Sequence, residues 1–505
     1  MNRLKMSSPI FMLVLVTVSC LEPPEQVHIS YGDTPDQMVV LWSTLEDVKG
    51  VVQYGEDRVQ LTERANSTMT RLTFESWNAR QFMHRAQLKK LKAKTKYFYK
   101  VTSVEGATTT SSRIFSFTTM DVTTSRRAAF LVYGDLGVEG KDTFSRIEQE
   151  VDSGDYESIW HIGDFAYDMH SNGGLVGDQF MRAVENIAAN IPYMTSPGNH
   201  EIAGAEAFLH YRTRFSTPGT PWPIPLNSMW YSYNVGPVHF ISYSTEVYFT
   251  HDQNYVCEQY DWLLKDLLHA NQNRQSQPWI IAMGHRPMYC SNNDIDDCTG
   301  RIFSGWVRRS LEDLFHVQGV DLVIEAHEHS YERLFPLYKG NLVKTDYNNL
   351  TSSVHIISGA AGNKEGRDGM AGSFKPWSAY RHDKVGDNTY GRLVVHNSTH
   401  LYWDQVRSVN GDVIDSMWLV QYNHGPFVRN VSCAGRGDHS SCHCPTPFHY
   451  LTASICIVVV LVVVVVGVVA GVVTCRRRRR RRRRNKNYQL MSVVPDEDNE
   501  GLLSL

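Results

Sequence analysis

Five short apolar runs between residues 128 and 332 constrain the fold most, because each one ends in polar residues capable of chemistry. The runs read AAFLVYGDLG, SIWHIGDFAYD, PYMTSPGNHE, PWIIAMGHRP and DLVIEAHEHSYE. Segments with a helical pattern, such as DTFSRIEQEV and YDWLLKDLLHAN, lie between them. Alternating strands and helices predict an α/β fold, with a sheet covered by helices on both faces. In such folds ligands bind outside the carboxyl ends of the strands.

The predicted strand ends carry side chains that can bind metal ions. They are Asp135, Asp164, Tyr167, Asn199, His200, His285, His327 and His329. Taken singly, each has an ordinary interpretation, such as a turn aspartate or a histidine with one hydrogen bond. The HEH triplet is more specific, because residues two apart on an extended segment point to the same side. Solubility does not require five strand ends that all deliver carboxylate, phenol, amide or imidazole, so the set predicts a metal site.

The types of ligand indicate the class of metal. Structural zinc favours cysteine ligands in a closed tetrahedron, whereas oxygen donors with imidazole suit zinc, iron or manganese. Without His200 the set holds two Asp, one Tyr, one Asn and three His. That is too many for one catalytic ion but suits two ions that share a carboxylate. A phenolate favours a ferric ion, and two neighbouring ions can activate water and hold a phosphoryl group.

The blocks GDLG, GDFAYD, GNHE, AMGH and AHEH, in this order, resemble the five blocks of the purple acid phosphatases, a branch of the dinuclear metallophosphoesterases. Most metallophosphoesterases carry D-x-H in the first block. Here Gly137 replaces that histidine and Tyr167 compensates for it, which marks the purple branch. The resemblance covers roughly residues 25–420. It implies a fibronectin III-like β-sandwich followed by a four-layer αββα metallophosphoesterase domain.

The resemblance also implies a role for each residue. Asp135, Tyr167 and His329 are expected to hold Fe(III), and Asn199, His285 and His327 a divalent zinc, iron or manganese ion. Asp164 is expected to bridge the two ions. His200 is expected to contact the phosphate without binding metal, and His200 and Asp164 are the implied catalytic residues. The implied reaction is hydrolysis of phosphomonoesters at acidic pH by a metal-bound hydroxide.

Two positions depart from the family pattern. The last block begins with Ala326 where the family often has glycine. Plant-type members also have a second histidine about ten residues after the GH block, whereas here none occurs between His285 and His316. Asp294 or Asp296 is a candidate replacement, since a carboxylic acid can donate a proton at low pH. The identity of the general acid is therefore left open.

The region before the catalytic blocks has a different pattern. Residues 22–122 hold short β-rich runs such as MVVLWST and TKYFYKVTS, separated by turn residues. Five to seven short strands over this length predict an all-β sandwich. The catalytic domain is expected at 126–420. Residues 1–20, with a basic start and an apolar run before Ser19 and Cys20, have the pattern of a secretory signal peptide.

The other end of the chain predicts a membrane anchor. Residues 421–450 are expected to form a stalk containing cysteine, and 451–474 lack charge and are long enough for a transmembrane helix. Nine arginines at 476–484 follow at once, which places the tail, 475–505, in the cytoplasm. Nucleic-acid binding is the competing interpretation of the arginines, but beside a membrane span it is disfavoured, and no nucleic-acid partner is predicted. The signal peptide, the single span and the arginines after it together predict a single-pass type I membrane protein.

Further motifs agree with this topology. Glycosylation sequons begin at Asn66, Asn349, Asn397 and Asn430, all before the predicted span. Cys290 and Cys298 close a short polar loop and are the expected disulfide, since this region would face an oxidising lumen. In the tail, YQLM at Tyr488 and DNEGLL at Leu502 and Leu503 resemble sorting signals that clathrin adaptors bind. An endosomal or lysosomal location is expected, with the cell surface as the alternative.

Two other functions remain open from the sequence. A related dinuclear phosphodiesterase or nucleotide hydrolase would share the same metal ligands, because loops outside the motifs select the substrate. A non-catalytic, receptor-like ectodomain would also suit a β-sandwich, a single span and a short tail. The receptor interpretation predicts the loss of at least one ligand, and all seven are present.

Overall fold

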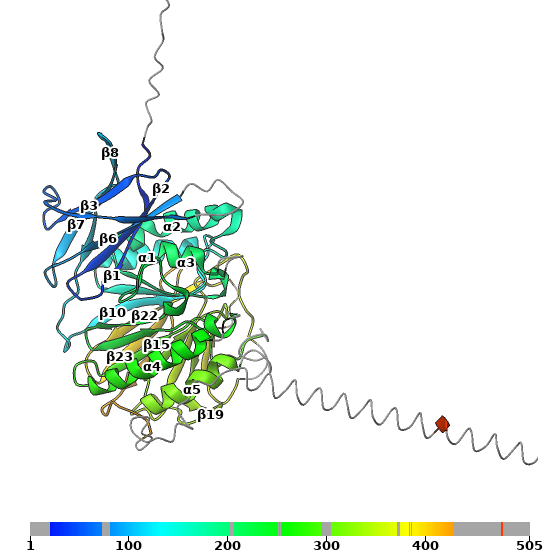
Figure 1. Cartoon of the computed structure of the whole chain (residues 1–505). Helices are drawn as coiled ribbons and strands as arrows, with labels where there is room; N and C mark the ends of the chain where they lie inside the picture. Colours follow the sequence, from blue (N-terminus) through cyan, green and yellow to red (C-terminus); the bar gives the residue numbers. More distant parts are fainter. Residues whose placement is uncertain are drawn as a thin grey trace, which may run out of the picture. The chain divides into compact units, whose positions relative to one another are not determined.

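The computed structural model describes residues 21–72, 81–202, 207–250, 252, 254–293, 305–370, 374–382, 384, 386–428 and 476–477. The chain divides into two compact units, Met1–Pro445 and Thr446–Leu505. All the strands and the helices with assigned bounds belong to the first unit. In Figure 1 its amino-terminal strands are blue, and helices α4 and α5 are green.

Two sheets form the amino-terminal β-sandwich. One has the order β1 (Glu25–Tyr31), β2 (Met38–Thr44), β6 (Gln81–Leu88) and β5 (Thr68–Leu72). The other has the order β4 (Glu63–Asn66), β3 (Lys49–Gly55), β7 (Lys96–Glu105) and β8 (Thr108–Ser111), with β9 (Phe115–Thr118) paired to β7. The described residues thus form nine strands here, more than the expected five to seven. The β-rich runs of the sequence fall on β1, β2, β3, β5, β7 and β9. The strands that no run predicts are the short β4 and β8, and β6, in which polar Gln81 and His84 are buried.

Two larger sheets follow. The first has the order β12 (Tyr193–Ser196), β11 (Ser158–Ile162), β10 (Ala128–Tyr133), β22 (Thr389–Val395), β23 (His400–Arg407) and β24 (Val413–Val420). The second has the order β13 (Tyr231–Val235), β14 (Val238–Ser242), β15 (Trp279–Met283), β16 (Leu322–Glu325), β20 (Val354–Ser358), β17 (Tyr331–Leu334) and β21 (Ser378–His382). A small hairpin joins β18 (Leu337–Tyr338) and β19 (Asn341–Leu342). All five apolar runs are strands, as predicted.

The two sheets pack face to face, with helices on their outer faces. Phe240 of β14 contacts Phe130 of β10 and Trp160 of β11, with ring centroids 4.7 and 4.5 Å apart. Helices α1 (Lys141–Ser153), α2 (Leu175–Ala188) and α3 (Leu209–Arg214) share an apolar cluster with the outer face of the first sheet. Helices α4 (Asn254–Gln272) and α5 (Trp306–Gln318) share another with the second, and lie beside β15 in Figure 1.

This arrangement agrees with the four-layer αββα domain that the resemblance implies, and it corrects the single sheet with helices on both faces that the alternation of elements predicts. The apolar runs are divided between the sheets, because β10, β11 and β12 belong to the first, and β15 and β16 to the second. Strands buried on both faces read as continuous apolar runs in either arrangement. The alternation of strand and helix therefore predicts the mixed α/β character, which is confirmed. It does not predict which strands belong to which of the two sheets.

The β-sandwich packs directly against the catalytic sheets through one continuous apolar core. Polar contacts also cross the boundary, since Tyr99 Oη donates to the carbonyl oxygen of Ala189 at 2.7 Å. The guanidinium of Arg214, at the end of α3, is fully buried and pairs with Asp178 of α2 at 2.7 Å. It also donates to the side-chain oxygen of Gln26, on the sandwich side, at 2.7 Å. These contacts fix the sandwich to α2 and α3.

Several predictions concern residues outside the described part of the chain. They are the signal peptide at 1–20, the transmembrane helix at 451–474, Asp294, Asp296, Cys298, Asn430, Tyr488, Leu502 and Leu503. Within the described residues no helix has both the length and the apolar character needed to cross a membrane. Cys290 is buried, and its pairing with Cys298 stays a prediction. The sequon residues Asn66, Asn349 and Asn397 are exposed, as glycosylation would require.

Candidate metal centre

The ends of strands from both sheets converge on one site. Asp135, Asp164 and Asn199 follow β10, β11 and β12 of the first sheet, while His285 and His327 follow β15 and β16 of the second. Tyr167 lies in the segment after β11, and His329 lies in the segment after β16. Short polar contacts link all seven predicted ligands into one network. The structure therefore brings the whole predicted set together.

Three of these residues form one donor group. The phenol oxygen of Tyr167 lies 2.8 Å from His329 Nε2 and donates to Asp135 Oδ1 at 3.3 Å. His329 Nε2 lies 3.7 Å from the same Asp135 oxygen. All three side chains are buried or nearly so. A phenol oxygen, a carboxylate oxygen and an imidazole nitrogen thus face one another at distances that a single ion could bridge.

The second donor group lies around His285. Its Nε2 is 3.1 Å from Asn199 Oδ1, 3.2 Å from His327 Nδ1 and 3.1 Å from Asp164 Oδ2. One ligand atom each from Asp164, His285 and His327 fall within 4.8 Å of one another, the spacing expected of a metal site. Asp164 is therefore the carboxylate within reach of this group, and its role as a bridge to the other group stays a prediction.

The orientation of His285 is set by the backbone. Its Nδ1 lies 2.8 Å from the carbonyl oxygen of Ile162, which can only accept a hydrogen bond. Nδ1 must therefore carry a hydrogen, which leaves Nε2, the nitrogen that faces Asn199, His327 and Asp164, as the one that can bind a metal ion. Metal-binding histidines typically donate their other ring N–H to such a carbonyl.

The two histidines of the HEH triplet do not lie on an extended segment. Strand β16 ends at Glu325, and His327 has a left-handed backbone with φ 69°. The turn separates the two imidazoles, so that His327 joins the group around His285 while His329 joins Tyr167. The expectation that alternation directs both to one side is therefore wrong, although both histidines belong to the site.

Left-handed backbone conformations gather at the strand ends. Asp135, Asp164, Tyr167 and His327 all have φ between 54° and 69°, a region that residues other than glycine seldom adopt. Such conformations persist where the surrounding structure holds them, which is common at functional sites. Gly198 is required for a different reason, because a Cβ there would collide with the side chain of Asp164.

Glu201 holds two of these loops together. Its buried carboxylate accepts hydrogen bonds from the backbone nitrogens of Asp164 at 2.9 Å, Phe165 at 2.9 Å and Gly198 at 2.7 Å. The loop after β11 is thereby tied to the loop after β12. The sequence pattern contains Glu201 as the last residue of GNHE, but only the fold reveals that it positions Asp164 and Asn199 through the backbone.

The electrostatics of the site favour bound cations. Burial and the neighbouring charge of Asp164 raise the pKa of Asp135 well above its usual range. Burial and the carboxylates of Asp135 and Asp164 likewise raise the pKa of Tyr167. For Asp164, burial opposes ionisation, but His285 outweighs it and lowers the pKa. A multivalent cation would relieve this crowding of acidic groups, so the donor set fits a metal centre.

The loop between β20 and β21 closes the Tyr167 side of the site. Asn363 Nδ2 donates to the phenol oxygen of Tyr167 at 2.5 Å, and Lys364 Nζ donates to its backbone oxygen at 3.2 Å. Asp368 accepts a hydrogen bond from the backbone nitrogen of His329 at 2.5 Å. No sequence pattern predicts these contacts, because the segment AAGNKEGRDG contains no cluster of His, Cys or Asp that would mark it.

His200 lies beside both donor groups. Its Nδ1 is 3.0 Å from Asp168 Oδ1, and its Nε2 lies 3.9 Å from Asp164 and 3.6 Å from Glu365. The ring centroid is 4.5 Å from that of Tyr167. Burial alone would lower the pKa of His200, but the carboxylates of Asp164 and Asp168 raise it. The imidazole is half-buried and is aligned by Asp168, while its role stays a prediction.

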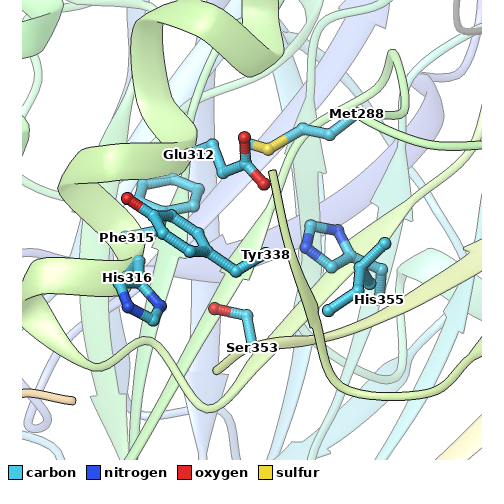
Figure 2. A pocket seen from close by; sticks show the side chains of 8 residues that line it. Met288, Glu312, Phe315, His316, Tyr338, Ser353 and His355 are labelled. Atoms are coloured by element: carbon cyan, nitrogen blue, oxygen red, sulfur yellow. The ribbon is translucent and has the colours of Figure 1, made fainter. Parts of the chain in front are cut away.

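Two cavities lie away from this centre. One, of about 10 Å³, has room for about one water molecule. Figure 2 shows its lining residues, Met288, Glu312, Phe315, His316, Leu337, Tyr338, Ser353 and His355, with the rings of His316 and Tyr338 stacked 3.7 Å apart. The other, of about 530 Å³, lies at the border of the sandwich and includes Lys94, Arg126 and Asp155. Neither lining contains a predicted ligand.

Family comparisons cover most of the chain. The model of the purple acid phosphatase N-terminal domain matches residues 24–119. The model of the calcineurin-like phosphoesterases matches residues 128–331. The model named iron/zinc purple acid phosphatase-like protein C matches residues 352–416.

Individual proteins and a solved structure agree with these matches. Acid phosphatase type 7 of Danio rerio is 43% identical over 425 residues, which cover 80% of this chain and 92% of that protein. Acid phosphatase type 7 of Homo sapiens is 40% identical over 412 residues, covering 79% and 91%. The structure of purple acid phosphatase PPD1 from yellow lupin (Lupinus luteus) seeds superimposes with a TM-score of 0.68 at 24% identity, covering 79% of this chain and 74% of that one.

Replacing Glu201 by glutamine should weaken metal binding by about 10- to 100-fold, the usual effect of losing a residue that orients metal ligands. The amide nitrogen of glutamine cannot accept a hydrogen bond, so at least one backbone N–H beside Asp164 or Asn199 would lose its partner. Titration of the metal-free protein with zinc and iron measures the change. Glu185→Gln is the matched control, because Glu185 accepts a backbone hydrogen bond from Val27 at 3.0 Å, away from the site. Equal affinities in the two variants would contradict the positioning role.

Proposed function

The chain is an acid phosphatase of the purple acid phosphatase family, and we propose that it hydrolyses phosphomonoesters at a centre of one ferric and one divalent ion. Members of this family use a dinuclear metal centre, and Asp164, His285 and His327 of this chain are spaced as a metal ion would require. The observation that supports the proposal most is the division of the ligands into two donor groups, with Asp164 in contact with His285 of one group and its charge acting on Asp135 and Tyr167 of the other.

The two donor groups differ in charge, which supports different ions. Asp135, Tyr167 and His329 would hold the ferric ion, because a carboxylate and a phenolate are hard anionic donors. Asn199, His285 and His327 are neutral donors and would hold the divalent ion, which we take to be zinc, iron or manganese. Asp164 would bridge the ions with its two carboxylate oxygens.

Two ions bound in this way would activate water and neutralise charge on the phosphoryl group. The protein would supply orientation and the remaining polar contacts. His200, aligned by Asp168 at 3.0 Å, is placed to contact a phosphate oxygen beside the bridging carboxylate. Asp294 and Asp296 remain the candidates for protonating the leaving group. A receptor-like ectodomain without activity is disfavoured, because the seven ligands are present and contact one another.

The ferric assignment predicts that the purified protein is coloured and that Tyr167→Phe removes the visible absorption band. Phenylalanine lacks the oxygen that would donate charge to iron. Absorption spectroscopy with metal analysis on the same samples measures both properties. Tyr193→Phe is the control, since Tyr193 is a buried tyrosine of the first sheet outside the ligand set. A colourless wild-type protein that contains its full complement of iron would contradict the assignment.

The proposed roles of Asp164 and His200 predict opposite effects on metal content. Asp164→Asn removes an anionic bridge, so both metal content and turnover should be lost. His200→Ala should retain the metals and lower kcat by roughly 100-fold or more, as expected for a residue that assists the reaction. Hydrolysis of a chromogenic phosphomonoester and metal analysis provide the data. Loss of metal from His200→Ala would place His200 among the ligands instead.

We also propose that the enzyme is anchored in the membrane and works in endosomes or lysosomes. Support comes from the sequence, in which the uncharged segment 451–474 precedes nine arginines and a tail with two sorting motifs. The catalytic unit would then face an acidic lumen, where an acid phosphatase can work, and the exposed sequon residues Asn66, Asn349 and Asn397 would be accessible to glycosylation.

The sorting motifs predict that replacing Tyr488, Leu502 and Leu503 together by alanine raises the amount of protein at the cell surface. The change removes both signals that clathrin adaptors would bind. Surface labelling of intact cells that express the full chain measures the effect, and Ser504→Ala, next to the second motif, serves as the control. An unchanged surface level would refute the sorting role and leave the phosphatase proposal intact.

A further inference from the structure

Five aromatic side chains form a continuous patch at one end of strands β22, β23 and β24. The ring centroid of Trp418 lies 4.8 Å from that of His396, 5.0 Å from that of Tyr402 and 6.3 Å from that of His400. The ring of His400 is in turn 6.1 Å from that of Tyr422. Trp418 is 49% exposed and Tyr422 is 62% exposed. Exposed groups of large apolar side chains typically mark a surface that binds something.

The alternation of side chains along β23 and β24 explains why this aromatic patch faces outward. Leu401 and Trp403 of β23 and Leu419 of β24 belong to the core between the sheets. Their neighbours Tyr402 and Trp418 pair across the two strands and therefore point to the opposite face. Strand β24 is also the last in the order of its sheet. Proteins commonly cover such edge strands, because an exposed apolar edge can pair with other chains.

A glycosylation sequon lies at the border of the aromatic patch. Residues 397–399, with the sequence NST, connect β22 to β23. This turn stands directly between His396 and His400, which both belong to the patch and flank Trp418. The first sugar of a glycan on Asn397 would therefore begin next to exposed aromatic rings.

The turn also fixes the direction of the Asn397 side chain. Its Oδ1 accepts hydrogen bonds from the backbone nitrogens of Thr399 at 2.8 Å and His400 at 2.9 Å, and lies 3.0 Å from Thr399 Oγ1. On the core side, Trp279 Nε1 donates to the backbone oxygen of Asn397 at 2.9 Å. Because these bonds hold Oδ1, the position of Nδ2, the atom that carries an N-linked glycan, is defined as well.

We propose, on the basis of the glycosylation proposed above, that the glycan on Asn397 packs over the aromatic patch, with its first sugars on the ring of Trp418. The faces of a pyranose ring expose C–H groups, which suit the electron-rich face of an aromatic ring. Sugar hydroxyl groups can bond to the imidazoles of His396 and His400. The glycan thus covers the edge strand β24. A bulky group in this place also blocks the approach of a flat partner, such as a second copy of the chain.

The test compares the wild-type chain with Asn397→Asp, both produced in cells that glycosylate secreted proteins. Aspartate keeps the oxygen that accepts the hydrogen bonds of the turn but cannot carry a glycan. Mass spectrometry gives the glycan occupancy, and hydroxyl-radical labelling gives the accessibility of Trp418. In Asn397→Asp the labelling of Trp418 should rise. The unfolding temperature should fall by about 2 °C, the size of shift expected when a surface contact is lost from a chain of this length.

Double variants show whether the glycan acts through the Trp418 ring. Trp418→Thr removes the ring and leaves a residue that suits a strand. Adding Asn397→Asp to it should lower the unfolding temperature no further, because the effects of contacting groups are not additive. Val413→Thr is the matched control, since Val413 lies on the same strand and is also 49% exposed. In that background Asn397→Asp should have its full effect.

Variants of two other sequons control for the loss of a glycan as such. Asn66→Asp removes a glycan from the β-sandwich and should leave the labelling of Trp418 unchanged. Asn349 lies nearer to the patch, since its Oδ1 accepts a hydrogen bond from the backbone nitrogen of Tyr422 at 3.1 Å. A rise in the labelling of Trp418 in Asn349→Asp, but not in Asn397→Asp, would overturn the assignment to Asn397.

Three further results would overturn the inference. They are a wild-type chain without a glycan on Asn397, unchanged labelling of Trp418 in Asn397→Asp, and labelling of Trp418 that falls with protein concentration in both proteins, which would indicate a second copy as the cover. Hydrolysis of a phosphomonoester, measured on the same samples, should be equal in all variants. A wild-type chain that lacks this activity would refute the phosphatase proposal and leave the packing of the glycan intact.

Discussion

The burial of two carboxylates side by side, Asp135 and Asp164, is the constraint on which the rest of this site depends. Both side chains are almost completely excluded from solvent. Two neighbouring carboxylates in such surroundings repel each other and resist ionisation, unless cationic or hydrogen-bonding partners surround them. The chain meets this requirement with imidazoles from the opposite sheet and with backbone amides. The fold can therefore tolerate the cluster, and bound metal ions would stabilise it further.

The two-sheet architecture makes this concentration of ligands possible. A single parallel sheet presents its strand ends along one line, whereas two sheets packed face to face present two lines opposite each other. Here the first sheet contributes mostly oxygen donors, Asp135, Asp164, Tyr167 and Asn199, and the second contributes the imidazoles of His285, His327 and His329. Neither sheet alone has a complete donor group, since each group contains ligands from both.

The sequence predicts well which side chains converge at the site, because each follows a strand that is buried on both faces. Such strands read as apolar runs, and the first polar residue after each run marks the strand end, as at Asp135 and His285. Interactions through the backbone leave no comparable pattern. Glu201 and Asn363 position the site by contacts with partners far away in the sequence, and periodicity carries no information about such contacts. The division of strands between two sheets was unpredictable from alternation for the same reason.

The β-sandwich contributes to the site through its contact with the segment that follows Tyr167. The side chain of Arg214 is fully buried. Its guanidinium donates to Gln26 of the sandwich and pairs with Asp178 of α2. The same guanidinium lies 3.5 Å from the carbonyl oxygen of Gly174, which ends the connection between Tyr167 and α2. Removing one partner of a buried ion pair is strongly destabilising, so this contact holds α2 and the connection in a fixed relation to the sandwich. The amino-terminal sandwich, although it supplies no ligand, therefore helps to fix the backbone that carries Tyr167 into the site.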